Sequence, residues 1–249
     1  MILSRISRAL KDQNWLAVGI EFVIVVAGVM LAFQVTQFSQ DHAEAQRRAV
    51  ALDRLHDEVE TSTGVLMMFV RIYEELNTDR TEALERQQAG DFDGMDEEAM
   101  TDALVALALF PAFSPPEGVY NEIVTSGMLS GLGDTTFRDA LSRYQSSVVF
   151  LQGQIDYFRL LSTAEPGMDS FPSVWLEFDP ASSRGRRHIV DWLAAADDPD
   201  LYQHVLNGNN RMRAMESWWR DTLDAALALC AETARLTDQA CEPEGPHAS

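Results

Sequence analysis

Three groups of polar side chains have the residue types that proteins use for chemistry, and the first lies within residues 53–60. In a helix, Asp53, His56 and Glu60 would share one face, as the carboxylate and imidazole ligands of di-iron bundles do. Such a centre needs Glu-x-x-His sets on other helices, and none of the other four histidines stands in one. We therefore interpret the group as surface charges and predict no catalytic residue in it.

The second group, Asp91, Asp93 and Asp96 around Gly94, has the residue types of a calcium-binding loop. The glycine, however, stands at the wrong position for an EF-hand, and no glutamate follows at the spacing that closes one. A loop that leads into a helix accounts for these residues better. The sequence also lacks a phosphate-binding glycine loop and a nucleophile elbow. We predict no cofactor and no metal site.

The third group is the pair Cys230 and Cys241, the only cysteines of the chain. Neither belongs to a Cys-x-x-Cys motif. In an oxidising periplasm the pair could form a disulfide that pins the C-terminal tail to the last helix, whereas in a reducing cytosol both would remain thiols. The location of the domain decides between these states, and we predict the disulfide if the domain is periplasmic.

Location depends on residues 15–38, WLAVGIEFVIVVAGVMLAFQVTQF, whose one charged residue is Glu21. About 20 helical residues cross the hydrocarbon core of a bilayer. From Val23 to Phe33 the run is apolar on all sides, unlike a core helix of a soluble protein. A cleavable signal peptide is the alternative, because Ala43-Glu44-Ala45 resembles a cleavage site, but that site lies far beyond the apolar core. We predict a permanent transmembrane helix in the lipid bilayer.

One face of this helix combines a carboxylate with small side chains. At about 100° per residue, a narrow arc contains Ala17, Glu21, Ile24, Gly28 and Ala32. Gly28 and Ala32 form a small-xxx-small pair, which lets another helix approach closely, and a carboxylate in lipid normally faces protein or water. We predict that this face packs against another membrane protein subunit or a second copy of the chain. Alternatively, Glu21 reaches toward the cytoplasmic interface by itself.

Charge predicts the orientation of the chain. The leader, residues 1–14, carries Arg5, Arg8 and Lys11, and the positive-inside rule places such a leader in the cytoplasm. The domain after the span is then periplasmic, on the outer side of a bacterial inner membrane. The net charge of the chain is −20. Because this charge repels phosphate backbones, we exclude nucleic acid as a partner.

Helical periodicity continues beyond the membrane segment without a linker. An apolar heptad seam, with Ser62 as its polar member, is formed by Leu52, Leu55, Val59, Leu66, Phe69, Tyr73 and Leu76. The first helix should therefore run to the region of Gly90, which caps it.

Start and stop signals predict the remaining helices over residues 96–110, 117–129, 134–158, 187–196 and 198–236, with an irregular connection from 166 to 186. The run 207–210, Asn-Gly-Asn-Asn, indicates a kink or break in the last helix. The predicted fold class is all-α: an N-terminal transmembrane helix that continues into an antiparallel helical bundle. The domain should occupy residues 39–240, and a flexible tail residues 241–249.

Two segments carry a resemblance to a known group of proteins. In the span the matching residues are Gly19, Glu21, Gly28, Ala32 and Gln34. In the domain a Tyr-x-Glu-(Ile/Leu)-x-x-Ser-Gly motif is matched by Tyr120, Glu122, Ile123, Ser126 and Gly127. These residues resemble a family of uncharacterised bacterial single-span inner-membrane proteins with a helical extracytoplasmic domain. The likeness covers about residues 15–60 and 118–145, although Ile20 separates a Gly and a Glu that are often adjacent in the family. It implies the architecture and no activity.

Placement and architecture together predict a non-enzymatic, membrane-anchored accessory or scaffold subunit of a larger inner-membrane complex. The alternative is a periplasmic sensory or ligand-binding helical module. Because a leader of 14 residues leaves no room for an output domain, such a module would act through a partner.

Overall fold

The computed structural model describes residues 15–182 and 185–243, with side chains from residue 19 onward. The predicted basic leader and residues 244–249 of the predicted tail lie outside the described residues. The chain divides into two units, residues 1–50 and 51–249. The elements in chain order are α2 (Trp15–Ala89), α3 (Glu97–Val105), η1 (Ala106–Ala108), α4 (Gly118–Thr125), η2 (Met128–Gly131), α5 (Thr135–Thr163), η3 (Met168–Ser170), β1 (Val174–Phe178), β2 (Arg186–Val190), α6 (Trp192–Ala196) and α7 (Pro199–Thr237).

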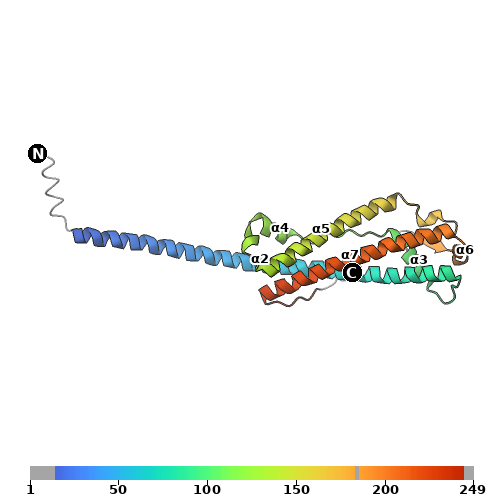
Figure 1. Ribbon diagram of the computed structural model, residues 1–249, viewed down its shortest axis with the longest axis horizontal. Coiled ribbons are helices and arrows are strands. Elements are labelled where there is room, and N and C mark those ends of the chain that lie inside the picture. Colours follow the sequence, from blue (N-terminus) through green and yellow to red (C-terminus); the bar gives the residue numbers. More distant parts are fainter. Residues whose placement is uncertain (1–14, 183–184, 244–249) are drawn as a thin grey trace. The chain divides into compact units, whose positions relative to one another are not determined.

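The second unit is a bundle built on α2, α5 and α7, which confirms the predicted all-α class (Figure 1). Its long helices pair through contacts at both ends. Residues 56 and 77 of α2 contact residues 233 and 216 of α7, and residues 134 and 165 that flank α5 contact residues 235 and 211 of α7. Helix α7 therefore runs antiparallel to both α2 and α5.

Helices α2 and α5 run in the same direction because the segment between them returns along the bundle. The hydroxyl of Tyr73 donates a hydrogen bond of 2.9 Å to the carbonyl of Leu109. Ten residues later, the backbone N–H of Val119 donates to Glu58 at 2.9 Å. Between these points the chain has moved back by about four helical turns of α2, so that α5 can start beside the beginning of the bundle.

The centre of the core is Trp219 on α7, which has no exposed surface. Its ring lies 4.7 Å from that of Phe69, 6.1 Å from that of Tyr73 and 5.4 Å from that of Phe113, measured between centroids. The neighbouring Trp218 points elsewhere and stacks on Phe158 at 5.7 Å. Consecutive helical residues point about 100° apart, so one tryptophan fills the centre and the other covers the contact between α5 and α7.

Three of the predicted helix starts are confirmed by side-chain caps. Asp96, Asp134 and Asp198 each accept a hydrogen bond from a backbone N–H of the first turn, at 3.0, 3.0 and 2.9 Å. Gly90 ends α2 with a φ of 66°, as a capping glycine should. Capping aspartates each stabilise a helix by about 1 kcal/mol, and the acidic composition of the chain supplies them readily.

The prediction for residues 166–196 is partly wrong. Strands β1 and β2 form an antiparallel hairpin within the connection that was expected to be irregular, and Arg187–Val190 belong to a strand rather than a helix. Only α6, beginning at Trp192, is helical. The hairpin forms because Val174 and Val190 are paired and both buried. Each strand is only five residues long, which leaves little alternation to detect.

Helix α7 passes residues 207–210 without interruption, so a break of the helix at this run is wrong. Gly208 and Asn209 are buried. A Cβ atom at position 208 would lie 2.6 Å from Cδ2 of Leu107, so the glycine allows η1 to approach α7. The predicted helix over 117–129 is also shorter, because Gly127 adopts a φ of 73° and ends α4 at Thr125.

Candidate functional site

The first candidate surface is the apolar stretch of α2 in the first unit. One helix of the described chain is long and apolar enough to cross a membrane, and it lies near the N-terminus. Glu21, Ile24, Gly28 and Ala32 are all exposed, and a Cβ atom at Gly28 would meet nothing within 4 Å. Ala17 lies in the helix, but its side chain is outside the described residues. No described part of the chain covers this face.

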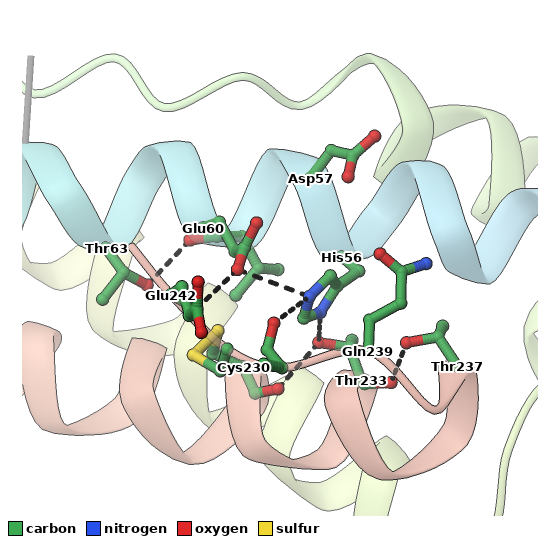
Figure 2. Close-up of polar contacts among 12 residues, drawn as sticks. His56, Asp57, Glu60, Thr63, Cys230, Thr233, Thr237, Gln239 and Glu242 are labelled. Atoms are coloured by element: carbon green, nitrogen blue, oxygen red, sulfur yellow. Dashed lines mark hydrogen bonds and ion pairs between the residues drawn. A yellow bond between two sulfur atoms is a disulfide. The ribbon is translucent and has the colours of Figure 1, made fainter. Parts of the chain in front are cut away.

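The second candidate site lies where the C-terminal tail returns to the bundle (Figure 2). Cys230 and Cys241 are joined by a disulfide, with their Cα atoms 5.7 Å apart. Cys230 is fully buried on α7. The bond therefore fixes residue 241 to the core side of α7, and the part of the tail up to residue 243 that the structure describes is attached rather than free.

His56 holds the same segment from α2, as Figure 2 shows. Its Nε2 lies 3.0 Å from the carbonyl oxygen of Ala240, and its Nδ1 lies 2.8 Å from the hydroxyl of Thr233. Because a carbonyl oxygen only accepts, Nε2 carries a hydrogen and donates it. Glu60 lies 3.5 Å from the same nitrogen and accepts a hydrogen bond of 2.7 Å from the backbone N–H of Glu242.

This arrangement corrects the interpretation of residues 53–60 as surface charges. His56 is 1% exposed and belongs to the core. Asp53 is exposed and accepts a hydrogen bond of 3.2 Å from Gln239. The three side chains hold the tail, and among the described residues no group of three or more His, Cys, Asp or Glu side chains could hold a metal ion.

His56 is one member of a row of buried polar side chains that we call the polar seam of α2. Its members are His56, Thr63, Asn77, Arg80 and Gln87, which are all at most 7% exposed. His56 and Asn77 bond to α7, Arg80 to α3, Gln87 to α6, and Thr63 to α2 itself. Gln87 donates to the carbonyl of Ala195 in α6, and Asn77 donates to Glu216 in α7.

Arg80 is the most deeply buried charge of the described chain, with no exposed surface. Its guanidinium donates to the carbonyl oxygen of Ala103 at 3.0 Å and to the side-chain oxygen of Asn77. Burial lowers the pKa of Arg80 to about 10, so the group remains charged at neutral pH. The side-chain amide of Asn77 accepts from Arg80 and donates to the carboxylate of Glu216, so it connects the buried cation to an anion.

A groove of about 710 Å³ lies above this link and is lined by acidic side chains of α2 and α7. Three of its four carboxylates, those of Glu74, Glu82 and Glu216, are engaged by arginines. Arg220 bonds to Glu74 at 2.7 Å and to Glu216 at 2.6 Å, and Arg86 bonds to Glu82 at 2.7 Å. The groove therefore presents compensated charge.

The residues considered for calcium have structural roles instead. Asp96 caps α3, and the carboxylate of Asp91 accepts a hydrogen bond of 3.1 Å from the backbone N–H of Asp93. Both contacts stabilise a loop that leads into a helix, as the sequence predicts.

A titratable cluster joins the end of α5 to α7. Arg211 forms a two-pronged ion pair with Glu165, which lowers the pKa of that carboxyl group. His204 lies nearby, with its ring 5.0 Å from that of Phe171. Burial lowers the pKa of His204, and the charge of Glu165 offsets part of this effect.

The third candidate surface is the outward face of α5. Val149, Phe150, Tyr157 and Leu160 are between 50% and 70% exposed, although they are large apolar or aromatic side chains. A groove of about 880 Å³ opens beside Ser146, Val149 and Phe150. Sequence reasoning missed this surface because it followed the core-facing seam of the same helix.

Fold and surfaces together define a helical bundle whose helix α2 begins with an apolar stretch that is long enough to cross a membrane. No protein-family model, no curated protein and no solved structure matches the chain.

Proposed function

We propose that the chain is a non-enzymatic accessory or scaffold subunit of a larger protein complex in a bacterial inner membrane. One observation carries the proposal. The apolar stretch near the N-terminus has no buried side chain in its most apolar window, and residues 19–38 are all exposed. Apolar surface of that extent is stable only in lipid or against another protein.

The bundle supports this reading because it completes its core without the apolar stretch. Its buried cluster begins at Ala51 and closes around Trp219. The apolar stretch is therefore free to serve an external contact, and its face with Glu21, Gly28 and Ala32 has the residue types of a helix-packing surface.

The proposed periplasmic location of the bundle rests on two independent features. The leader with Arg5, Arg8 and Lys11 favours the cytoplasm for the N-terminus. The disulfide between Cys230 and Cys241 requires an oxidising compartment to persist. Both features support a location of the bundle outside the cytoplasm.

Membrane attachment is tested by fractionation of cells that express the full chain with a C-terminal tag. We expect the chain to remain in the membrane pellet after alkaline carbonate extraction and its mass to include the leader. A soluble product that begins near residue 46 would identify a cleaved signal peptide and overturn the anchor. Protease added to spheroplasts should digest the tagged bundle, and protection of the tag would reverse the orientation.

The subunit role is tested by purification in mild detergent followed by mass spectrometry. We expect stoichiometric membrane protein partners. Glu21→Leu and Gly28→Leu should each reduce the recovered partner at least tenfold, while Phe22→Leu, on another side of the helix, should not. Equal recovery from all three variants would remove the packing face from the proposal.

A further inference from the structure

Glu21 is the only charged residue of the apolar stretch, and its neighbours on the helix offer it no polar contact. Its side chain is exposed. The residues one helical turn away, at positions 17, 18, 24 and 25, are alanine, valine, isoleucine and valine. No lysine or arginine stands between Lys11 and Arg47 in the sequence. A carboxylate within a membrane is costly unless it faces water or a protein group that compensates its charge.

The face that carries Glu21 is also the face on which another helix can come closest. Gly28 lies two turns further along the same arc, and Ala32 lies one turn beyond it. A Cβ atom at Gly28 would meet nothing within 4 Å, so the glycine has no packing role within the described chain. Small residues let the backbones of two membrane helices approach closely. A helix that packs on Gly28 and Ala32 also passes the carboxylate of Glu21.

A second copy of the chain fits this face poorly. Two copies that are inserted in the same direction carry Glu21 at the same depth. A two-fold contact through the face then brings the two carboxylates together, and like charges repel strongly in a medium of low dielectric constant. Each copy also carries a net charge of −20. Charge complementarity therefore favours a partner that supplies the opposite charge.

We propose that this face binds a transmembrane helix of a different subunit, and that this helix carries an arginine or lysine side chain at the depth of Glu21. The basic side chain forms an ion pair with the carboxylate, while Gly28 and Ala32 provide the close approach. In the proposed orientation Glu21 lies near the cytoplasmic end of the span, and membrane proteins concentrate lysine and arginine on the cytoplasmic side. The inference rests on the proposed accessory role and names the chemistry of the partner that this role requires.

Glu21→Gln tests the charge without changing the shape of the side chain. The full chain is purified in mild detergent, and the co-purified partner is quantified relative to the chain present in the membrane fraction. We expect Glu21→Gln to reduce the recovered partner at least tenfold, because the amide is neutral. Glu21→Asp keeps the charge and should reduce recovery less. Equal recovery from Glu21→Gln and the original chain would overturn the ion pair.

The same purification separates this inference from the accessory role. If Glu21→Gln keeps the partner while Gly28→Leu loses it, the accessory role stands and the ion pair is wrong. If no membrane protein co-purifies with the original chain, the accessory role fails and the inference falls with it.

A photo-cross-linking amino acid at position 24 identifies what covers the face. Ile24 shares the arc of Glu21, whereas Phe22 points to another side of the helix. We expect position 24, and not position 22, to cross-link to a transmembrane helix that has an arginine or lysine near its cytoplasmic end. A cross-linked dimer of this chain, or a linked helix without a basic residue there, would refute the proposal.

Charge exchange tests the pairing between the two subunits directly. Glu21→Arg places two cations opposite each other and should reduce the recovered partner at least tenfold. Replacement of the partner's basic residue by glutamate in the same cells should restore recovery to within about threefold of the original pair. Failure of the exchange to restore recovery would contradict a direct ion pair at Glu21.

Discussion

The disulfide between Cys230 and Cys241 allows the most direct test of the energetics of the bundle. The change is Cys241→Ser, because Cys241 is only partly buried whereas Cys230 has no exposed surface. The bond closes a loop with a sequence separation of 11 residues. On the chain-entropy model, a loop of that length lowers the entropy of the unfolded chain by an amount that stabilises the fold by about 2.8 kcal/mol.

A second contribution comes from the tail that the bond holds. If residues 239–242 detach, Nε2 of His56 loses its acceptor, the carbonyl of Ala240. A buried donor without a partner costs about 1–3 kcal/mol unless water reaches it. We therefore expect Cys241→Ser to lower the free energy of unfolding by about 4–6 kcal/mol in total.

The assay is guanidinium unfolding of the full chain in mild detergent, followed by tryptophan fluorescence, which reports on the buried Trp219. Reductant should lower the stability of the original chain by the same amount and leave Cys241→Ser unchanged. Mass spectrometry of the original chain should show a gain of two hydrogen atoms on reduction. A difference in stability below about 0.5 kcal/mol would show that the loop constraint derived from chain entropy does not operate here.

Three further predictions concern glycine packing, buried charge and pH. Gly153→Ala should stabilise the bundle by about 1 kcal/mol, since the new methyl group meets open space. Gly208→Ala should be less stable than Gly153→Ala by roughly 2 kcal/mol, because its methyl group overpacks the core. Thermal unfolding of both variants measures this difference, and equal stabilities would contradict the close approach of Leu107 to position 208. Arg80→Met should change the free energy of unfolding by less than about 1.5 kcal/mol because it removes the cost of a buried charge. Asn77→Leu leaves that charge without its amide partner and should lower the free energy of unfolding by about 3 kcal/mol, measured in denaturant. A larger loss in Arg80→Met than in Asn77→Leu would refute the role of Asn77 as the partner of the buried charge. Burial lowers the pKa of His204, so the unfolded chain binds more protons below the ordinary histidine pKa, and the free energy of unfolding should fall as the pH drops through that range. His204→Gln should make the free energy of unfolding depend less on pH between about pH 7 and 5. An unchanged pH dependence in this variant would count against the burial of His204.

The sequence predicts the helices well because their signals are local. Aspartate caps and a capping glycine define the ends of α3, α5, α7 and α2, and each cap acts within one turn. The β1–β2 hairpin was not predicted because its strands are short and its paired residues are distant in the sequence. A buried pair such as Val174 and Val190 is recognisable only once the two strands are aligned.

The polar seam of α2 was not predicted from the sequence for a different reason. The buried residues of α2 and the apolar seam predicted from the sequence share Val59, Leu66 and Tyr73. Between these shared residues, the buried positions 56, 63, 70 and 77 each lie one residue after the predicted positions 55, 62, 69 and 76. The buried row also includes His56 and Asn77, which are polar. A heptad pattern that allowed buried polar residues would have included His56, Asn77 and Gln87, which bond to α7 and α6.

The outward face of α5, with the exposed Val149, Phe150, Tyr157 and Leu160, shows the opposite case. Its apolar side chains, such as Tyr157 and Leu160, are present in the sequence, but only the structure shows that they stay exposed while the other face of the helix is buried. Periodicity predicts that a face packs, and only the structure indicates whether its partner lies within the chain.

The polar seam explains how α7 finds its register on α2. Apolar heptads repeat every seven residues, so apolar packing alone discriminates weakly against a shift of seven. With such a shift, Asn77 would lose Glu216, and His56 would meet an alanine, Ala226 or Ala240, in place of Thr233. Each mismatch leaves a buried polar group without its partner, which costs about 1–3 kcal/mol.

Replacement of three of the five polar-seam residues should therefore separate the stability of the fold from the uniqueness of its helix register. The triple variant His56→Leu, Asn77→Leu and Arg80→Met keeps the volumes roughly constant and buries more apolar surface, so its helical content and midpoint of unfolding should be retained. Its near-ultraviolet circular dichroism and the amide dispersion in its nuclear magnetic resonance spectrum should weaken, because several registers of α7 become similar in energy. A triple variant with native spectra would show that Trp219 and its ring contacts set the register without help from the polar seam.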